Sequence, residues 1–125
     1  MQLSNFNVVH ARDDASSTVL TDPLVHCHAG EQVVLAYVSR RALMDYFRVS
    51  GDRRITLGQW NLVVESNLER FKPIFEAKFE CDDCEVHNAQ GHNYPKLVVT
   101  LADMERSGQK FSMDVLDVDA GFRRF

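Results

Sequence analysis

Alternation of apolar and polar positions predicts several short strands in the first third of the chain. Residues 3–10 and 18–28 alternate moderately, and Asp22-Pro23 interrupts the second segment, because proline cannot donate to a sheet ladder. Ala29-Gly30-Glu31 has the composition of a hairpin turn. Residues 32–38 (QVVLAYV) are apolar at both alternating sets of positions. Such a strand is central and covered on both faces, or one face is held in a contact between subunits.

Two amphipathic helices are predicted after these strands. Ser39 is a suitable N-cap for a helix with the sequence RRALMDYFRV. Thr56, with Gln59 three residues later, has the pattern of a capping box and begins the second helix. Apolar residues recur there at spacings of three or four as far as Phe79. Pro73 lies inside this helix and is expected to kink or divide it near Phe71.

The last third of the chain is less regular. Residues 80–93 show no strand or helix period, whereas residues 96–101 (KLVVTL) predict a strand. Residues 102–109 predict a turn or a short helix ending at Gly108, and residues 111–118 alternate as in a last strand. The order is β-β-β-α-α-β with one possible further strand. We predict an α+β fold, with a small antiparallel sheet of four or five strands and two helices packed on it.

Three stretches carry a resemblance to known sequences. In VVLAYVSRRALMDYF (residues 33–47) a strand runs into a Ser-Arg-x-Ala-Leu helix start, followed by an aromatic residue. QWNLVVESNLERFKPIFEAKFE (59–80) has a polar-Arg-x-x-Ile arrangement, and LVVTLADM (97–104) has an Ala-Asp-apolar step. Over residues 18–104 the chain resembles a family of short uncharacterised bacterial proteins, a domain of unknown function. The resemblance implies a small α+β domain in a bacterial cytoplasm and no catalytic residue. The chain departs from the family in an insertion, residues 81–93, and a C-terminal extension, residues 105–125.

Composition agrees with one small globular domain over residues 1–125. Hydrophobic residues are 45 % and charged residues 26 % of the 125 residues. Fourteen Lys and Arg against 18 Asp and Glu give a net charge of −4, which disfavours non-specific binding of nucleic acid. We find no leader pattern and no apolar run near the roughly 20 residues that cross a membrane. With three cysteines, an odd number, we expect a cytoplasmic protein with reduced thiols and no membrane partner.

One segment has the residue types of a zinc site. Cys81, Cys84, His87 and His92 follow the pattern C-x2-C-x2-H-x4-H. Two thiolates at this spacing can hold one edge of a tetrahedral Zn²⁺, and two imidazoles can hold the other. A typical Cys2His2 finger separates its pairs by about 12 residues, so a solvated surface loop is the favoured alternative. A redox role for the two cysteines is disfavoured, because a helix end and four nearby carboxylates oppose thiolate formation.

A second group of metal-ligand types is His26-Cys27-His28. The two histidines share one face of the predicted strand and can chelate a metal, together with His10 if the register brings it opposite. The interpretation that we favour places Val25 and Cys27 in the core and both histidines toward solvent.

Basic residues gather around the first predicted helix. Five arginines stand against two aspartates, a net charge of +3 that suits a phosphate or an acidic partner: Arg40, Arg41, Arg48, Arg53 and Arg54 against Asp45 and Asp52. A solvated helix face is the favoured interpretation.

Enzyme motifs such as GxSxG, GxxxxGK[ST], GxGxxG and HExxH are absent from the sequence. We therefore predict a non-enzymatic interaction or regulatory domain, with a small zinc-binding protein as the alternative and an enzyme of unknown chemistry third. Because two helices cannot cover both faces of such a sheet, one face is expected to be partly bare, and bare apolar patches mark interfaces. We predict a homodimer, unless the N-terminal strand and the C-terminal extension fold over that face.

Overall fold

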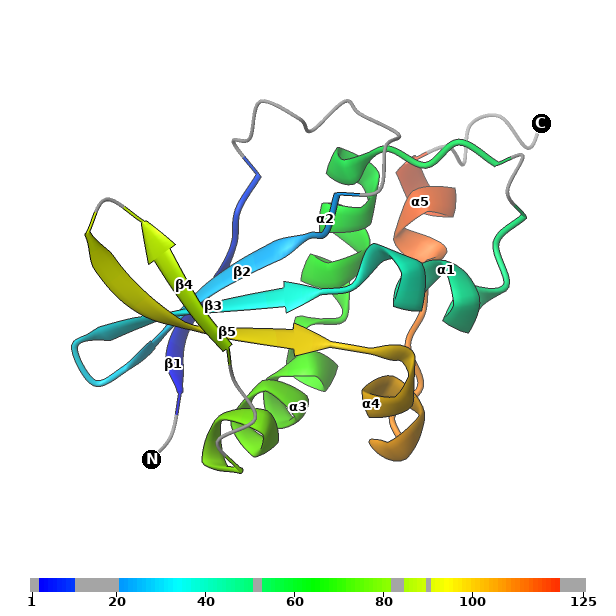
Figure 1. Ribbon diagram of the computed structural model, residues 1–125. Coiled ribbons are helices and arrows are strands. Elements are labelled where there is room, and N and C mark those ends of the chain that lie inside the picture. Colours follow the sequence, from blue (N-terminus) through cyan, green and yellow to red (C-terminus); the bar gives the residue numbers. More distant parts are fainter. Residues whose placement is uncertain (1–2, 11–20, 51–52, 82–84, 90, 120–125) are drawn as a thin grey trace.

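The computed structural model describes residues 3–10, 21–50, 53–81, 85–89 and 91–119 (Figure 1). It confirms the α+β class. The elements in chain order are β1 (Ser4–Val8), β2 (Leu24–Ala29), β3 (Gln32–Val38), α1 (Arg40–Phe47), α2 (Leu57–Ser66), α3 (Leu68–Glu80), β4 (Glu85–Ala89), β5 (His92–Val99), α4 (Leu101–Arg106) and α5 (Asp114–Asp119). Within these ranges, each helix is too short or too polar to cross a membrane.

The sheet has five strands in the order β1-β2-β3-β5-β4 and is mixed. The early hairpin is as predicted, with Gly30 in a left-handed conformation (φ 64°) between β2 and β3. The prediction of a wholly antiparallel sheet is wrong at its centre, since β3 and β5 pair in parallel from Leu35↔Lys96 to Val38↔Val99. Parallel neighbours need a long crossover connection, and α1, α2, α3 and β4 supply it.

The segment predicted to lack regular structure contains a strand. β4 pairs antiparallel with the first half of β5, from Glu85↔Lys96 to Ala89↔His92. β5 pairs with β3 only from Lys96 onward, the residue after Pro95, which has no N–H to donate. Residues 86–89 and 92–95 therefore form a two-stranded hairpin arm. The polar composition of β4 gives no strand pattern in the sequence, and pairing with β5 stabilises this strand.

The two predicted helix starts are confirmed. Ser39 Oγ accepts a hydrogen bond from the Ala42 N–H (3.2 Å) at the start of α1. Thr56 and Gln59 form a complete capping box at the start of α2, with reciprocal bonds of 2.9 and 3.1 Å. These contacts lie within four residues of each other, so local sequence is enough to predict them.

The second amphipathic segment is two helices, and the division differs from the predicted one. It falls at Asn67, six residues before Pro73, which lies inside α3. The Asn67 side chain is buried, and its amide donates to Val63 O (2.7 Å) and to Ser112 O (2.6 Å). The Ser112 N–H donates back to Asn67 Oδ1 (2.9 Å). A contact with a distant part of the chain therefore accompanies the break.

The C-terminal extension packs beside the helices and adds no strand over residues 111–119. The strand predicted over residues 111–118 is wrong, because residues 114–119 form α5, which lies against α2. Phe111 and Leu116 are buried in the core. The Phe111 N–H donates to the Tyr46 hydroxyl (3.2 Å), and its ring contacts Phe71 at a centroid distance of 4.6 Å. As far as residue 119, the extension leaves the other side of the sheet uncovered.

The core lies between one face of the sheet and α2 with α3. Figure 1 shows these two helices on the same side of the sheet, with α1 and α4 at the end where β3 and β5 finish. The fully buried side chains of this layer include Val25, Cys27, Val34, Ala36, Val38, Leu97 and Val99 from the sheet, and Trp60, Phe71 and Phe75 from the helices. Alternation along the strands sends the intervening side chains to the opposite face.

Candidate functional site

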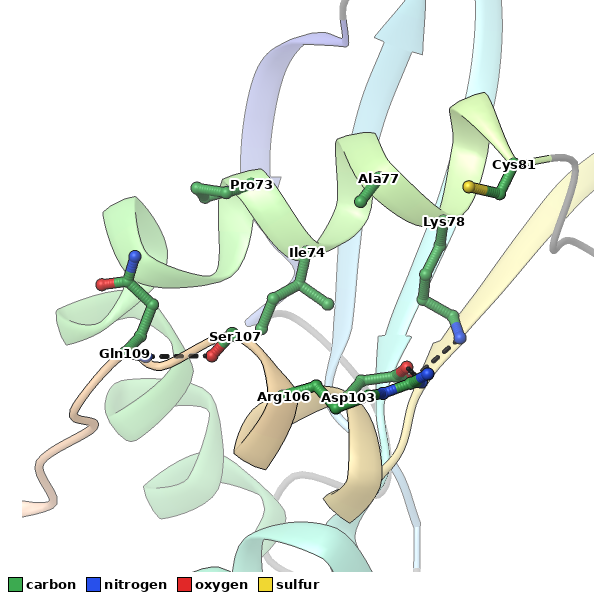
Figure 2. A pocket seen from close by; sticks show the side chains of 9 residues that line it. All are labelled: Pro73, Ile74, Ala77, Lys78, Cys81, Asp103, Arg106, Ser107 and Gln109. Atoms are coloured by element: carbon green, nitrogen blue, oxygen red, sulfur yellow. Dashed lines mark hydrogen bonds and ion pairs between the residues drawn. The ribbon is translucent and has the colours of Figure 1, made fainter.

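A hollow of about 480 Å³ lies between α3 and α4 (Figure 2). Its α3 wall is apolar, and Figure 2 shows Ile74 pointing from α3 toward α4. Lys78, Asp103 and Arg106 converge at one corner. The residues that line it in the described part of the chain are Pro73, Ile74, Ala77, Lys78, Cys81, Asp103, Arg106, Ser107 and Gln109.

Asp103 is the centre of the charged corner. Its Oδ2 accepts from Lys78 Nζ (2.9 Å), the Thr100 N–H (2.9 Å) and Thr100 Oγ1 (3.0 Å), and its Oδ1 accepts from Arg106 Nη2 (2.8 Å). Burial by itself would raise the pKa of Asp103. The bonds from Lys78 and Thr100 and the charge of Lys78 outweigh burial and hold that pKa below its ordinary value. The carboxylate thus stays ionised and keeps both cations in place.

The local sequence explains how α4 presents this carboxylate. Thr100 is the N-cap of α4, and the Asp103 N–H donates to Thr100 Oγ1 (3.4 Å), which completes a capping box. The box holds Asp103 in the first turn, from where it reaches Lys78 on α3. Sequence reasoning did not single out these residues. The Thr-x-x-Asp spacing is the signal that was there to find.

The second candidate is the sheet face opposite the helices, which we call the open sheet face. It carries a hollow of about 410 Å³ between the hairpin arm and strands β2 and β3. Leu24, His26, Val33, Leu35, Tyr37, His87 and Tyr94 line it. Most of these side chains are apolar or aromatic, and no helix of the described ranges lies over them.

The interpretation that places Val25 and Cys27 in the core is confirmed, whereas the expected exposure of both histidines to solvent holds only in part. Val25 and Cys27 are fully buried, while His26 and His28 lie half-buried on the open sheet face. Burial, and secondly the charge of His28, lower the pKa of His26. His28 Nδ1 is buried and has no hydrogen-bond partner within the described part of the chain.

His10 does not complete a three-histidine site. The β1–β2 register sets Asn7 opposite His26 and Ser4 opposite His28. His10 Nε2 instead meets Glu65 Oε2 of α2 at 2.8 Å.

The four predicted zinc ligands are placed in part. Cys84 lies outside the described residues. Cys81 is exposed at the end of α3 and lines the α3–α4 hollow, whereas His87 lines the hollow on the open sheet face. The β4–β5 register puts His87 and His92 on one face of the hairpin arm. Among the residues with a described position, no three His, Cys, Asp or Glu side chains gather as metal ligands would. Zinc therefore stays a prediction.

The basic stretch is divided between the surface and the core. Arg41, Arg48, Arg53 and Arg54 are exposed, as a solvated face requires, and Arg41 pairs with Asp45 (3.5 Å). Arg40 does not belong to this face, because it is 2 % exposed and its guanidinium donates to Ile55 O. Its backbone N–H donates to Asp22 Oδ1 (2.8 Å). Arg40 thus ties the start of α1 to two loops, an arrangement that helical periodicity does not reveal.

Comparison with known proteins gives no match to a family model, to a curated protein or to a solved structure. The resemblance of residues 18–104 to a bacterial family of unknown function stays a prediction.

Proposed function

We propose that this protein is a non-enzymatic interaction domain that forms a homodimer through its open sheet face. The supporting observation is the apolar stripe across β2, β3 and β5, where Leu24, Val33, Leu35 and Tyr37 lie with Tyr94 around one hollow. Leu35 is 8 % exposed and the other four side chains are half-buried, so a second layer would complete their burial. Apolar side chains gathered at a surface hollow are typical of an interface.

A second copy of this chain is the partner that the charges of this face favour. A two-fold contact sets the same patch of each subunit against the other, so the patch must be complementary to itself. The open sheet face carries one cation and one anion at the same rim, Lys96 Nζ and Glu85 Oε2, 3.9 Å apart. A two-fold axis that passes beside this rim would set Lys96 of each copy against Glu85 of the other. Lys96 also lies over the Tyr37 ring (5.1 Å to the centroid), which keeps its charge beside the apolar stripe.

The oligomeric mass in solution tests this proposal. Light scattering after size exclusion, at tens of micromolar, is expected to give twice the 14.3 kDa of one chain. Val33→Lys places a charge in the stripe and is expected to give the monomer mass. Gln32→Lys is the matched control, since Gln32 is exposed on the same strand and lies outside the hollow. A monomer mass for the unchanged protein, or a dimer that survives Val33→Lys, refutes the proposal.

A zinc-binding role is the second candidate, supported by the shared face of His87 and His92. Elemental analysis of purified protein, with Cys84→Ser beside it, tests this role. One zinc per chain that is lost in the variant supports it, and absence of zinc from the unchanged protein rejects it. We also propose a cytoplasmic location, which the two free cysteines of the described ranges, Cys27 and Cys81, support.

A further inference from the structure

We propose that the α3–α4 hollow binds a small organic carboxylate whose aliphatic part lies along α3. Its volume of about 480 Å³ is in the range of small-molecule sites, roughly 300–1,000 Å³. Such sites combine a mainly apolar wall with a few converging polar groups. Here Ile74 is buried at the base, and the small apolar residues Pro73 and Ala77 are exposed beside it.

The charge of the corner selects the class of ligand. Among the described residues of the lining, Lys78 and Arg106 are positive and Asp103 is negative, and Arg106 is the exposed one of the three. A monoanionic carboxylate is repelled less by the neighbouring Asp103 than a phosphate monoester, which carries a charge of about −1.5 to −2. A carboxylate also accepts the paired N–H groups of a guanidinium in one plane.

The cations are held in position before a ligand arrives. Lys78 and Asp103 are nearly buried, with side chains 11 % and 7 % exposed, and their 2.9 Å contact joins α3 to α4. Arg106 is tied to Asp103 by Nη2 but is 76 % exposed, so its outer edge is accessible to a ligand. Binding therefore orders few side chains, which lowers its entropic cost. This site lies apart from the open sheet face and does not depend on the proposed homodimer.

Titration of the ¹⁵N-labelled protein with sodium hexanoate, followed by amide chemical shifts, tests the site. Hexanoate is expected to give saturable shifts at residues 74–81 and 103–109. Hexanamide, which has the same apolar body without charge, and acetate, which has the charge without the body, are expected to bind more weakly. Arg106→Gln should weaken hexanoate binding about fivefold, the effect of losing one exposed ion pair of roughly 1 kcal/mol.

Two further variants complete the design. Ala77→Glu places a carboxylate on the apolar wall and is expected to abolish hexanoate binding. Because Ala77 is exposed, this substitution should leave the fold intact. Arg41→Gln removes an exposed arginine of α1 that does not line the hollow, and should leave hexanoate binding unchanged. Equal affinity for hexanoate and hexanamide, equal weakening by Arg41→Gln and Arg106→Gln, or absence of saturable shifts at residues 74–81 and 103–109 each overturn the proposal.

Discussion

Replacing Asp103 by Asn tests whether the buried charge at the α3–α4 contact stabilises the fold. The amide keeps the size of the carboxylate and can still accept from the Thr100 N–H, a contact of 2.9 Å. It loses the negative charge that faces Lys78 Nζ at 2.9 Å and Arg106 Nη2 at 2.8 Å. The perturbation therefore isolates the charge from the helix cap.

The expected loss of stability follows from the burial of the two partners. Removing one partner of a buried ion pair costs about 3–5 kcal/mol, because the other charge stays desolvated. Lys78 is 11 % exposed at the rim of a hollow, so it keeps some access to water and the cost is reduced. Arg106 is 76 % exposed, and its pair adds at most about 1 kcal/mol. We expect Asp103→Asn to lower the free energy of unfolding by about 2–3 kcal/mol.

Urea unfolding followed by circular dichroism, at one protein concentration and pH 7, measures this loss. The double variant Lys78→Met/Asp103→Asn is the informative partner, because it also removes the largely buried ammonium group of Lys78. It should be more stable than Asp103→Asn alone. A single-variant loss below about 0.5 kcal/mol, the range of ordinary surface substitutions, refutes the reasoning. So does a double variant that is less stable than the single one.

The pH dependence has a definite sign. The pKa of Asp103 in the folded protein lies below the ordinary value of 3.8, so the unfolded chain binds this proton more readily. The carboxylate makes its full contribution to the free energy of unfolding at pH values above its ordinary pKa, and this contribution is lost as the pH falls through the lower pKa of the folded protein. The stability difference between the unchanged protein and Asp103→Asn should therefore shrink below pH 3.8. A difference that is constant from pH 7 to pH 2 contradicts this assignment.

Three further predictions concern the core, the open sheet face and the C-terminal extension. Burial, together with the charge of Glu76, raises the pKa of Cys27 to about 12. Iodoacetamide should therefore label Cys27 only after the protein unfolds. Peptide mapping that finds Cys27 labelled as fast as the exposed Cys81 contradicts this prediction. The pKa of His26 is lowered in the folded protein, so the unfolded chain binds a proton at a higher pH and the free energy of unfolding should fall as pH drops below 6.5. In denaturation experiments from pH 5 to 8, His26→Gln should reduce the slope of the free energy of unfolding against pH. An unchanged slope rejects this prediction. Asn67→Ala leaves the N–H and the carbonyl group of Ser112 without the Asn67 side chain as partner, and should lower the free energy of unfolding by about 2 kcal/mol. Proteolysis near residues 107–113 should be faster than in the unchanged protein. Equal proteolysis would show that this contact does not hold the extension.

Local sequence determined the features whose partners lie within a few residues. The alternation of 24–29 and 32–38, together with Gly30, predicted the β2–β3 hairpin and the burial of Val25 and Cys27. The helix starts at Ser39 and Thr56 were equally predictable, because an N-cap bonds to backbone groups two or three residues away. The sequence predicts too few helices to cover both faces of the sheet, so one face was expected to lack a covering helix. In the described part of the chain, the open sheet face is that face.

Tertiary structure decided the features whose partners are far apart in the chain. The parallel pairing of β3 with β5 and the strand β4 depend on which edges remain free after the helices pack, and a polar strand such as Glu85–Ala89 has no pattern of its own. Alternation over 111–118 gave the wrong element, because Leu116 is buried where α5 packs against α2, while Phe111 lies before this helix. The charged corner of the α3–α4 hollow joins Lys78 to Asp103, 25 residues apart. Each of these two residues alone looks like an ordinary surface charge, and only their packing in the folded chain removes both from water and makes the pair visible.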